Sequence, residues 1–463
     1  MVSQSDSEHG TALLTVLVVI TVVTIMVGLL LRTLVFQDQS TSRYLQMRQS
    51  AYLAEAGFHH VLEQFRTGEL PMDYGGTIVF KEDTCSIIVA RDGLYMQFTA
   101  QVDLPQIQRT YTSLVGYQAG LLFPEGLALE SSIASFVVSR GSILQGDLTL
   151  NGLDIHYSPP NLIETNVITG TIVNDTSFAL PHVTSYAIQH RLQAWQQQLD
   201  QNNAPQYTFQ NNTTITPDVF LHDSAVVTAN CQIKPASEFT PDTLQVERLY
   251  CSGDLTFGGD LYIPANTHIY SAGNIVFQDS VRSGKIFVYG NQGIFAQNQA
   301  DLRGQFIARQ QILLTHAARV GDYAVLLVPS NQEHLQGEPE IGILESARFG
   351  GVAFVVDTEA SDEIPLRSGM STSPQRGKIT VDTSQPTDGG FFVAGDIDIS
   401  GVHHGFIAAQ NLVHQINRTT WWNNFTGISL LRYRLPYQYP IPPLFTAAEQ
   451  LSLLTFQPLD GSE

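Results

Sequence analysis

The chain has little charge, few cysteines and a deficit of positive residues. Charged residues make up only 14% of 463 residues, and 43 Asp and Glu outnumber 23 Lys and Arg, which gives a net charge of −20. Binding to nucleic-acid phosphates needs a basic surface, so this balance argues against a nucleic-acid partner. The three cysteines (Cys85, Cys231 and Cys251) are too few for a disulfide scaffold and lack metal-binding spacing.

The N-terminal stretch lacks both charge and proline. No charged residue occurs from Thr11 to Leu31, and the first proline is Pro71. As a helix this uncharged run is about 30 Å long, the thickness of the hydrocarbon core of a bilayer. Lipid offers backbone groups no hydrogen-bond partner, so a single spanning segment must be helical. We predict one helix over residues 11–66, with its transmembrane part at 11–34.

An amphipathic stripe follows the apolar run. Its members recur at alternating intervals of three and four residues: Tyr44, Met47, Ala51, Ala54, Phe58, Val61 and Phe65. His59 and His60 are adjacent on this helix, so they point about 100° apart and are expected to face solvent rather than share a metal ion. The stripe predicts that the second half of the helix packs on a folded module.

Three short sequence features mark this N-terminus. The polar leader MVSQSDSEHG (residues 1–10) ends in Gly10, the apolar run opens TALLTVLVV, and SAYLAEAG occupies residues 50–57. In these features the N-terminus resembles the type IV pilin superfamily, in particular its PilX-like minor pilins and pseudopilins. The resemblance implies cleavage by a prepilin peptidase between Gly10 and Thr11. It also implies a single-pass bacterial inner-membrane protein with an extracytoplasmic ectodomain, which assembles with other pilin subunits through the helix.

Two features depart from the pilin pattern. Thr15 occupies the fifth mature position, where main-line pilins carry glutamate, and the leader contains no Lys or Arg. Arg32, Arg43 and Arg48 all follow the apolar run, so the positive-inside rule alone favours the reverse orientation. A simple membrane anchor is therefore the alternative to the pilin-like interpretation.

Residues 74–118 change to a period of two. Alternating stretches at 77–80, 85–89, 94–102 and 109–115 are separated by turn residues. We predict a four-stranded antiparallel meander that packs on the helix stripe, because neither element can bury its apolar face alone.

A short unit recurs from residue 120 to about residue 430. It consists of an apolar triplet, a turn such as Gly-Asp or Gly-Asn, and a second apolar triplet. Clear copies begin at Leu249, Ile269, Phe287, Phe306, Phe391 and Phe406, with an early copy at 139–150. A degenerate repeat of this length is typical of a β-solenoid (parallel β-helix), in which stacked coils bury one apolar column. We therefore predict a mainly β fold, with an Ig-like sandwich or jelly roll as the alternative.

Three stretches depart from this repeat. Residues 183–201 have the apolar spacing of an amphipathic helix inserted into the solenoid, and residues 358–386 form an irregular stretch rich in Ser, Asp, Pro and Thr. The aromatic, proline-rich tail at 431–463 is predicted to cap the last coil, whose edge would otherwise be exposed.

Motifs for catalysis, cofactors and metals are absent from the sequence. It has no G-x-S-x-G, no phosphate loop and no Cys/His metal spacing. The one candidate cation site combines Asp388, Asp396, Asp398, His403 and His404. Acidic residues at the corners of coils explain that cluster more simply, so we predict a non-enzyme without a cofactor or metal.

The C-terminal aromatic residues are candidates for contact with surface glycans or a protein partner. Trp421 and Trp422 lead this group, and Phe425, Tyr433, Tyr437 and Tyr439 accompany them. Aromatic rings stack on sugars but serve equally well in a hydrophobic cap.

The sequence as a whole predicts a structural and interaction protein, a minor pilin-like component of a type IV pilus or related filament. Its large surface-exposed solenoid would be adhesive or placed at the filament tip. The alternatives are a membrane-anchored carbohydrate-active β-helix protein and a permanently anchored surface adhesin or scaffold.

Overall fold

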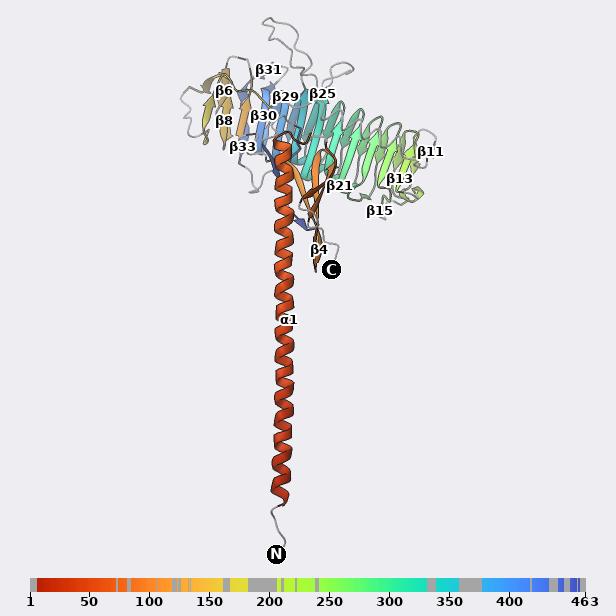
Figure 1. Cartoon of the computed structure of the whole chain (residues 1–463). Coiled ribbons are helices and arrows are strands. Elements are labelled where there is room, and N and C mark those ends of the chain that lie inside the picture. Colours follow the sequence, from red (N-terminus) through yellow and green to blue (C-terminus); the bar gives the residue numbers. More distant parts are fainter. Residues whose placement is uncertain are drawn as a thin grey trace.

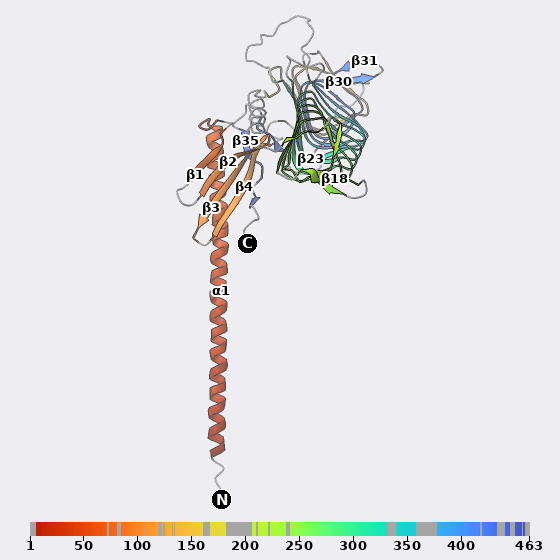
Figure 2. The same ribbon diagram turned by 90° about the vertical axis from the view of Figure 1, so that its right-hand side faces the viewer.

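The computed structural model of the chain is mainly β, with one long apolar N-terminal helix and a large parallel sheet (Figure 1). It describes residues 6–71, 74–80, 85–105, 107–118, 123, 126–131, 133, 135–160, 167–181, 206–209, 212–220, 223–237, 241–330, 339–357, 377–416, 419–432, 440–444, 450–455 and 457–458. An antiparallel sheet lies beside the C-terminal end of the helix. The parallel strands form a stack across that end (Figure 1, Figure 2).

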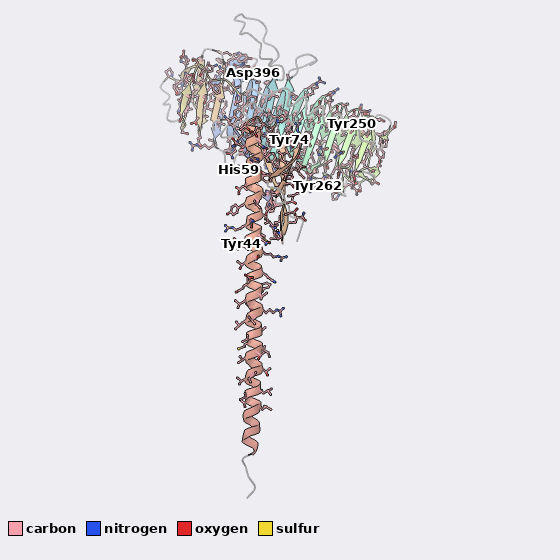
Figure 3. All side chains as sticks on the ribbon, in the orientation of Figure 1. Tyr44, His59, Tyr74, Tyr250, Tyr262 and Asp396 are labelled. Carbon is pink, nitrogen blue, oxygen red and sulfur yellow. The ribbon has the colours of Figure 1, made fainter. Side chains whose placement is uncertain are left out.

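The helix α1 (Asp6–Arg66) is continuous, as predicted, and already includes Gly10 and Thr11. Its C-terminal half buries the later members of the stripe, namely Ala54, Phe58, Val61 and Phe65. Tyr44 is 56% exposed (Figure 3), so its place in the packed stripe is a wrong prediction. Among the helix side chains that the structure describes, the first fully buried one is that of Ser50, whose hydroxyl lies 2.7 Å from that of Tyr111.

The antiparallel sheet confirms the predicted meander. Its strands are β1 (Gly76–Phe80), β2 (Cys85–Asp92), β3 (Tyr95–Leu104) and β4 (Ile107–Gln118). Each pairs with the next in antiparallel register. Phe98 on β3 stacks on Phe65 of the helix and is tilted against Phe58, with ring centroids 5.9 Å from each. These rings bury the stripe against the sheet, as its spacing requires.

The C-terminal tail lies on this sheet. The short strands β34 (Pro440–Ile441), β35 (Leu451–Leu453) and β36 (Gln457–Pro458) all pair antiparallel with β4. The Arg66 guanidinium at the end of α1 donates to the carbonyl of Leu451. The predicted cap over the last coil is therefore wrong for the described part of the tail, which protects the edge of the meander instead.

The large parallel sheet contains most of the remaining strands. They are β5 (Gly126–Leu129), β7 (Ile143–Leu144), β8 (Asp147–Leu150), β10 (Ile172–Asn174), β11 (Gln206–Tyr207), β12 (Thr213–Ile215), β13 (Ser224–Val227), β14 (Cys231–Ile233), β15 (Asp242–Thr243), β16 (Arg248–Cys251), β17 (Leu255–Phe257), β18 (Leu261–Ile263), β19 (His268–Ser271), β20 (Ile275–Phe277), β21 (Arg282–Gly290), β22 (Gly293–Ala296), β23 (Asp301–Ala308), β24 (Gln311–Leu314), β25 (Arg319–Ser330), β26 (Glu340–Glu345), β27 (Arg348–Asp357), β28 (Lys378–Thr383), β29 (Thr387–Ile399), β30 (Gly401–Ile416), β31 (Thr419–Trp422) and β33 (Ile428–Leu431).

Smaller elements complete the fold. A three-stranded parallel sheet contains β32 (Asn424–Phe425), β6 (Ser135–Ser139) and β9 (Asp154–Ser158). A 3-10 turn covers Pro217–Val219. The strand β28 lies within the stretch predicted to be irregular at 358–386, because its KITVDT sequence alternates inward and outward side chains. The predicted helix at 183–201 lies outside the described residues.

The parallel strands pair in three ladders. The first runs through β16, β19, β21, β23, β25, β27, β29 and β30, and the second through β14, β17, β20, β22, β24, β26 and β28. The third joins β15 and β18 to the N-terminal parts of β21, β23, β25 and β27. Apart from the β30–β31 hairpin, the pairings within this sheet are parallel. A sandwich or jelly roll is built from antiparallel strands, so that alternative is wrong for these strands.

The register corrects two repeat boundaries. Leu249, Ile269, Val288 and Phe306 are register partners, so the units are 20, 19 and 18 residues long. The predicted start at Phe287 is one residue early, and so is the predicted start at Phe406, because Phe391 pairs with Ile407. A slip of one residue moves a strand side chain to the other face, and Phe287 indeed lies outside, with its ring 5.8 Å from that of His268.

The order of strands in the stack differs from their order in the chain. The C-terminal strand β30 pairs with the early strand β5, which pairs with β8, which pairs with β10. The chain therefore enters the stack in its interior, runs to one end at β10, and resumes at the other end at β11. The strands from β11 onward then return to meet β5, and the sheet on α1 lies beside the middle of the stack (Figure 1).

Corner residues allow the strands to turn. Gly304 has φ +128°, and a side chain there would collide with the carbonyl oxygen of Ile286 on the neighbouring strand. Asn266, Asp279 and Asn298 take φ values of 65°, 60° and 61°, where Asn and Asp are tolerated better than bulky residues. Gly, Asn and Asp therefore occupy corners at these positions.

Two clusters of buried apolar side chains form the core of the protein. One fills the interior of the stack, where the rings of Phe257 and Phe277 stack 5.1 Å apart. The other joins α1, the meander and the outer face of the first ladder. Gln305 fixes this contact, because its side chain accepts from Leu94 N at 2.6 Å and donates to Asp92 O at 3.1 Å. The meander thus links the helix to the stack.

Candidate functional site

The apolar half of α1 is the first candidate site. Every large apolar side chain from Leu14 to Phe36 is exposed, and α1 is long and apolar enough to cross a membrane. The threonines within it suit lipid, because Thr21 donates to Leu17 O at 2.8 Å and Thr24 donates to Ile20 O at 2.7 Å. Such bonds satisfy hydroxyl groups that lipid cannot. This surface can enter a bilayer or pack against other helices.

The hairpin of β30 and β31 is the second candidate site. Trp421 and Trp422 pair with His414 and Val413 on β30 and are 50% and 43% exposed. All four residues of β31 are exposed. Successive strand residues point to opposite faces, so the hairpin presents one indole on each side. β31 lies on the side of the stack away from the apolar end of α1 (Figure 1, Figure 2).

Buried amides hold the base of this hairpin. Asn423 is 0% exposed with φ 49°, and its side chain accepts from Leu412 N at 3.2 Å and donates to Ser131 Oγ at 2.8 Å. Ser131 also donates to Asn411 Oδ1 at 2.7 Å, and Asn411 donates to Asp396 at 2.9 Å. The network joins early and late segments of the chain where they meet, so it fixes the direction in which the hairpin leaves the stack.

The aromatic residues near the hairpin have different roles. Phe425 is only 1% exposed and lies 6.2 Å from the ring of Phe136 in the core, so its assignment to a contact surface is wrong. It occupies an inward position of β32, which sequence spacing alone did not reveal. Tyr433, Tyr437 and Tyr439 lie outside the described residues.

The candidate cation residues do not form one cluster. Asp396 is bonded to Asn411, and Asp398 lies 3.8 Å from His414, in a different ladder from Asp388. Burial raises the pKa of the Asp398 carboxyl. Within the described parts of the chain, no group of three or more His, Cys, Asp or Glu could hold a metal ion. These acidic residues are outward or corner residues of separate ladders.

The two adjacent histidines of β30 point in opposite directions. His403 points into the stack, is 1% exposed, and bonds through Nδ1 to the hydroxyl of Thr387 at 2.7 Å. Burial lowers the pKa of His403 to about 3. His404 lies on the other side of the strand, 3.2 Å from Asp388. His59 and His60 on α1 are exposed, as predicted.

The sequence did not reveal the hydrogen bonds of Asn423 with Leu412 and Ser131 at the base of the hairpin, which we call the clamp. Ser131 and Asn423 are 292 residues apart in the chain, and nothing in their local patterns links them. The only available signal was the pair Asn423-Asn424 after two tryptophans, since Asn is favoured where φ is positive.

Comparison with known protein families, curated proteins and solved structures found no match for this chain.

Proposed function

We propose that this chain is a pilin-like subunit of a type IV pilus or a related filament. In this proposal α1 spans the inner membrane once, and the bond between Gly10 and Thr11 is cut by a prepilin peptidase. The three parallel ladders form a β-solenoid that the meander carries outside the cell. The protein acts as a structural and interaction component, not as an enzyme.

The division of α1 into two halves is the observation that carries the proposal. The half from Leu14 to Phe36 exposes all its large apolar side chains, whereas the half from Ser50 to Phe65 is packed on the meander. A bilayer and a bundle of helices are both apolar surroundings, so the exposed half can move from one to the other at little cost. A filament subunit needs this exchange, and a permanent anchor does not.

The extent of the stack favours a subunit that lies at the tip of such a filament or at few positions along it. It extends to both sides of α1 (Figure 1), so a copy on every subunit would crowd a thin fibre. The hairpin with Trp421 and Trp422 lies on the side away from the membrane segment. We assign that hairpin to contact with a surface glycan or a protein partner, because exposed indole rings offer large, rigid contact area.

The proposal is tested by mechanical shearing of cells that produce the full chain. A filament subunit is released with the sheared surface fraction, and Gly10→Val, which blocks the cut, keeps the protein in the membrane fraction. Gly28→Val is the matched control, because no atom lies within 4 Å of a side chain added at Gly28. Retention of the unaltered chain in the membrane would overturn the proposal in favour of a permanently anchored adhesin or scaffold.

A further inference from the structure

Two of the three cysteines meet inside the stack, near one of its ends. Cys231 lies on β14 and Cys251 on β16, and they are only 4% and 0% exposed. The two thiols hydrogen-bond to each other, and Cys251 also donates to the carbonyl of Ala229 at 3.2 Å. The two sulfur atoms are therefore in direct contact, although they belong to different ladders.

The peptide of Asp254 joins both cysteines to one corner of the stack. Cys231 N donates to Asp254 O at 3.0 Å, and Cys251 Sγ lies 3.7 Å from the same oxygen. The side chain of Asn230, next to Cys231 in the chain, accepts from Asp254 N at 2.8 Å. These bonds hold the two backbone segments together, so the thiols remain in contact while the stack is folded.

The neighbouring strands show that packing alone does not require cysteine at either position. At the position of Cys231, the following strands of the second ladder carry buried aliphatic residues, namely Leu255, Ile275, Ile294 and Ile312. At the position of Cys251, the next strand carries Ser271. Its hydroxyl donates to Gly253 O at 2.6 Å, the same kind of bond that the Cys251 thiol makes. An aliphatic residue and a serine would therefore serve the fold equally well.

The pair lies close to an end of the stack. In the described part of the chain, the ladders that contain β16 and β14 end at β11 and β12, one step beyond β13 and β14 (Figure 1). These end strands contain only two and three residues. Short strands with a neighbour on one side open more readily than strands in the middle of a sheet. A covalent bond between β14 and β16 would hold this end closed.

We propose that Cys231 and Cys251 form a disulfide that closes this end of the stack. The oxidant is another disulfide, that of glutathione or of a thiol oxidoreductase. The Cys251 thiolate attacks one sulfur atom of the oxidant, forms a mixed disulfide and expels one thiolate, which takes up a proton. Cys231 then loses its proton and attacks the Cys251 sulfur, which releases the second thiol of the oxidant. The two cysteines are oxidised, and the oxidant is reduced from one disulfide to two thiols.

The surroundings of the pair favour this reaction over metal binding. The hydrogen bond with Cys231 lowers the pKa of the Cys251 thiol, which favours Cys251 as the attacking group. A structural metal site needs about four ligands, and among the described residues no group of three or more metal-binding side chains occurs. Because both thiols are buried, the oxidant reaches them before the end strands pair or when these strands open. In the cell the bond needs oxidising surroundings, and here the inference rests on the proposed function, which places the stack outside the cell.

The test adds the oxidant to the purified full chain in detergent, so its result does not depend on where the protein lies in the cell. The chain is incubated with glutathione disulfide or with reduced glutathione, a few degrees below its thermal midpoint, where the end strands open. Free thiols are then blocked, and the chain is cut with trypsin. Cleavage after Arg248 separates the two cysteines, so a disulfide holds two peptides together until it is reduced. We expect mass spectrometry to find this linked pair after oxidation, with Cys85 linked to neither peptide.

The oxidised chain should also melt at least about 3 °C above the reduced chain, because the bond restricts the unfolded state. Cys231→Ile with Cys251→Ser introduces the residues that neighbouring strands carry, so this variant should fold, and its midpoint should not respond to glutathione. Cys85→Ala is the matched control, because it removes a buried thiol outside the stack and should keep the response. Free thiols at both positions after oxidation, or an equal response in the double variant, would overturn the proposal. A linked pair in a chain that shearing does not release would support the disulfide and contradict only the proposed function.

Discussion

The buried side chain of His403 makes the stability of the fold depend on pH. Its ring points into the stack and lies 4.6 Å from the ring of Phe391, and burial is the main reason that its pKa falls from 6.5 to about 3. Between those two pH values the unfolded chain binds a proton at this position and the folded chain does not. Stability therefore decreases as the pH falls through this range.

His403→Gln should flatten this dependence. The wild-type protein is expected to lose up to about 1.4 kcal/mol for each pH unit below 6.5 through this group, and the variant loses that contribution because glutamine does not titrate. The measurement is the thermal midpoint of the full chain in detergent between pH 7 and pH 4. His59→Gln, at an exposed helix position, is the control, and an unchanged slope in His403→Gln contradicts the account.

Cys85 offers a second test at the residue scale. Burial in the meander raises the pKa of its thiol from 9.0 to about 11, so very little reactive thiolate exists near neutral pH. Iodoacetamide at pH 8 should label Cys85 slowly in the folded chain and rapidly in denaturant, as measured by peptide mass spectrometry. Equal rates in the two conditions would show that the thiol is accessible and the sheet is not packed as described.

At the scale of elements, the contact between α1 and the meander depends on a few rings. Phe58 is fully buried and lies 5.9 Å from Phe98. Phe58→Ala should destabilise this contact by about 3–5 kcal/mol, since it removes a large buried ring. Denaturant melts of the full chain measure the effect. Tyr52→Ala, at a position 62% exposed on the same helix, should change stability by less than about 0.5 kcal/mol.

The corners of the stack make a separate prediction. Gly304→Ala should destabilise the stack by about 2–6 kcal/mol, because the new methyl group meets the carbonyl of Ile286 and the φ of +128° is strained for alanine. Gly75→Ala is the control, since its nearest atom, Val89 O, is 3.8 Å away. Loss of the far-ultraviolet β signal at a lower temperature in Gly304→Ala alone is the expected result, and equal melting of both variants contradicts it.

The elements themselves could largely be predicted from the sequence. The uncharged run, the stripe from Ala54 to Phe65 and the alternation at 85–102 are local patterns, and each gave the right element. The same patterns failed at Phe287 and Phe406, where two neighbouring apolar residues left the inward one undecided. The prediction for Tyr44 failed because the spacing of a stripe does not show which of its members become buried.

At the scale of the whole molecule, the order of the stack could not be predicted. The pairing of β5 with β30 joins Leu127 to Ile407, and no local pattern specifies so distant a partner. The same holds for the tail strand at Leu451, which pairs with Tyr117. The candidate sites followed this rule too. Trp421 and Trp422 were visible as a pair, but Ser131 and Asn423 at the base of the hairpin are 292 residues apart in the chain.

The hairpin allows a prediction about the assembled protein. Trp421→Ala with Trp422→Ala should leave the thermal midpoint within about 1 °C, because exposed side chains contribute little to stability. The same variant should lose attachment of producing cells to glycan-coated surfaces. Asn423→Ala should lower attachment and stability together, since it leaves the clamp on Ser131 unmade. Normal attachment of cells that produce the double tryptophan variant would show that the hairpin does not mediate this attachment.

The mature N-terminus tests the central claim most directly. Mass spectrometry of the native protein purified from its own membrane or filament fraction reads it in one step. The account predicts a chain that begins at Thr11, with residues 1–10 removed by the peptidase. An intact Met1 at the start of the native protein would contradict the pilin-like account and leave α1 as a permanent membrane anchor.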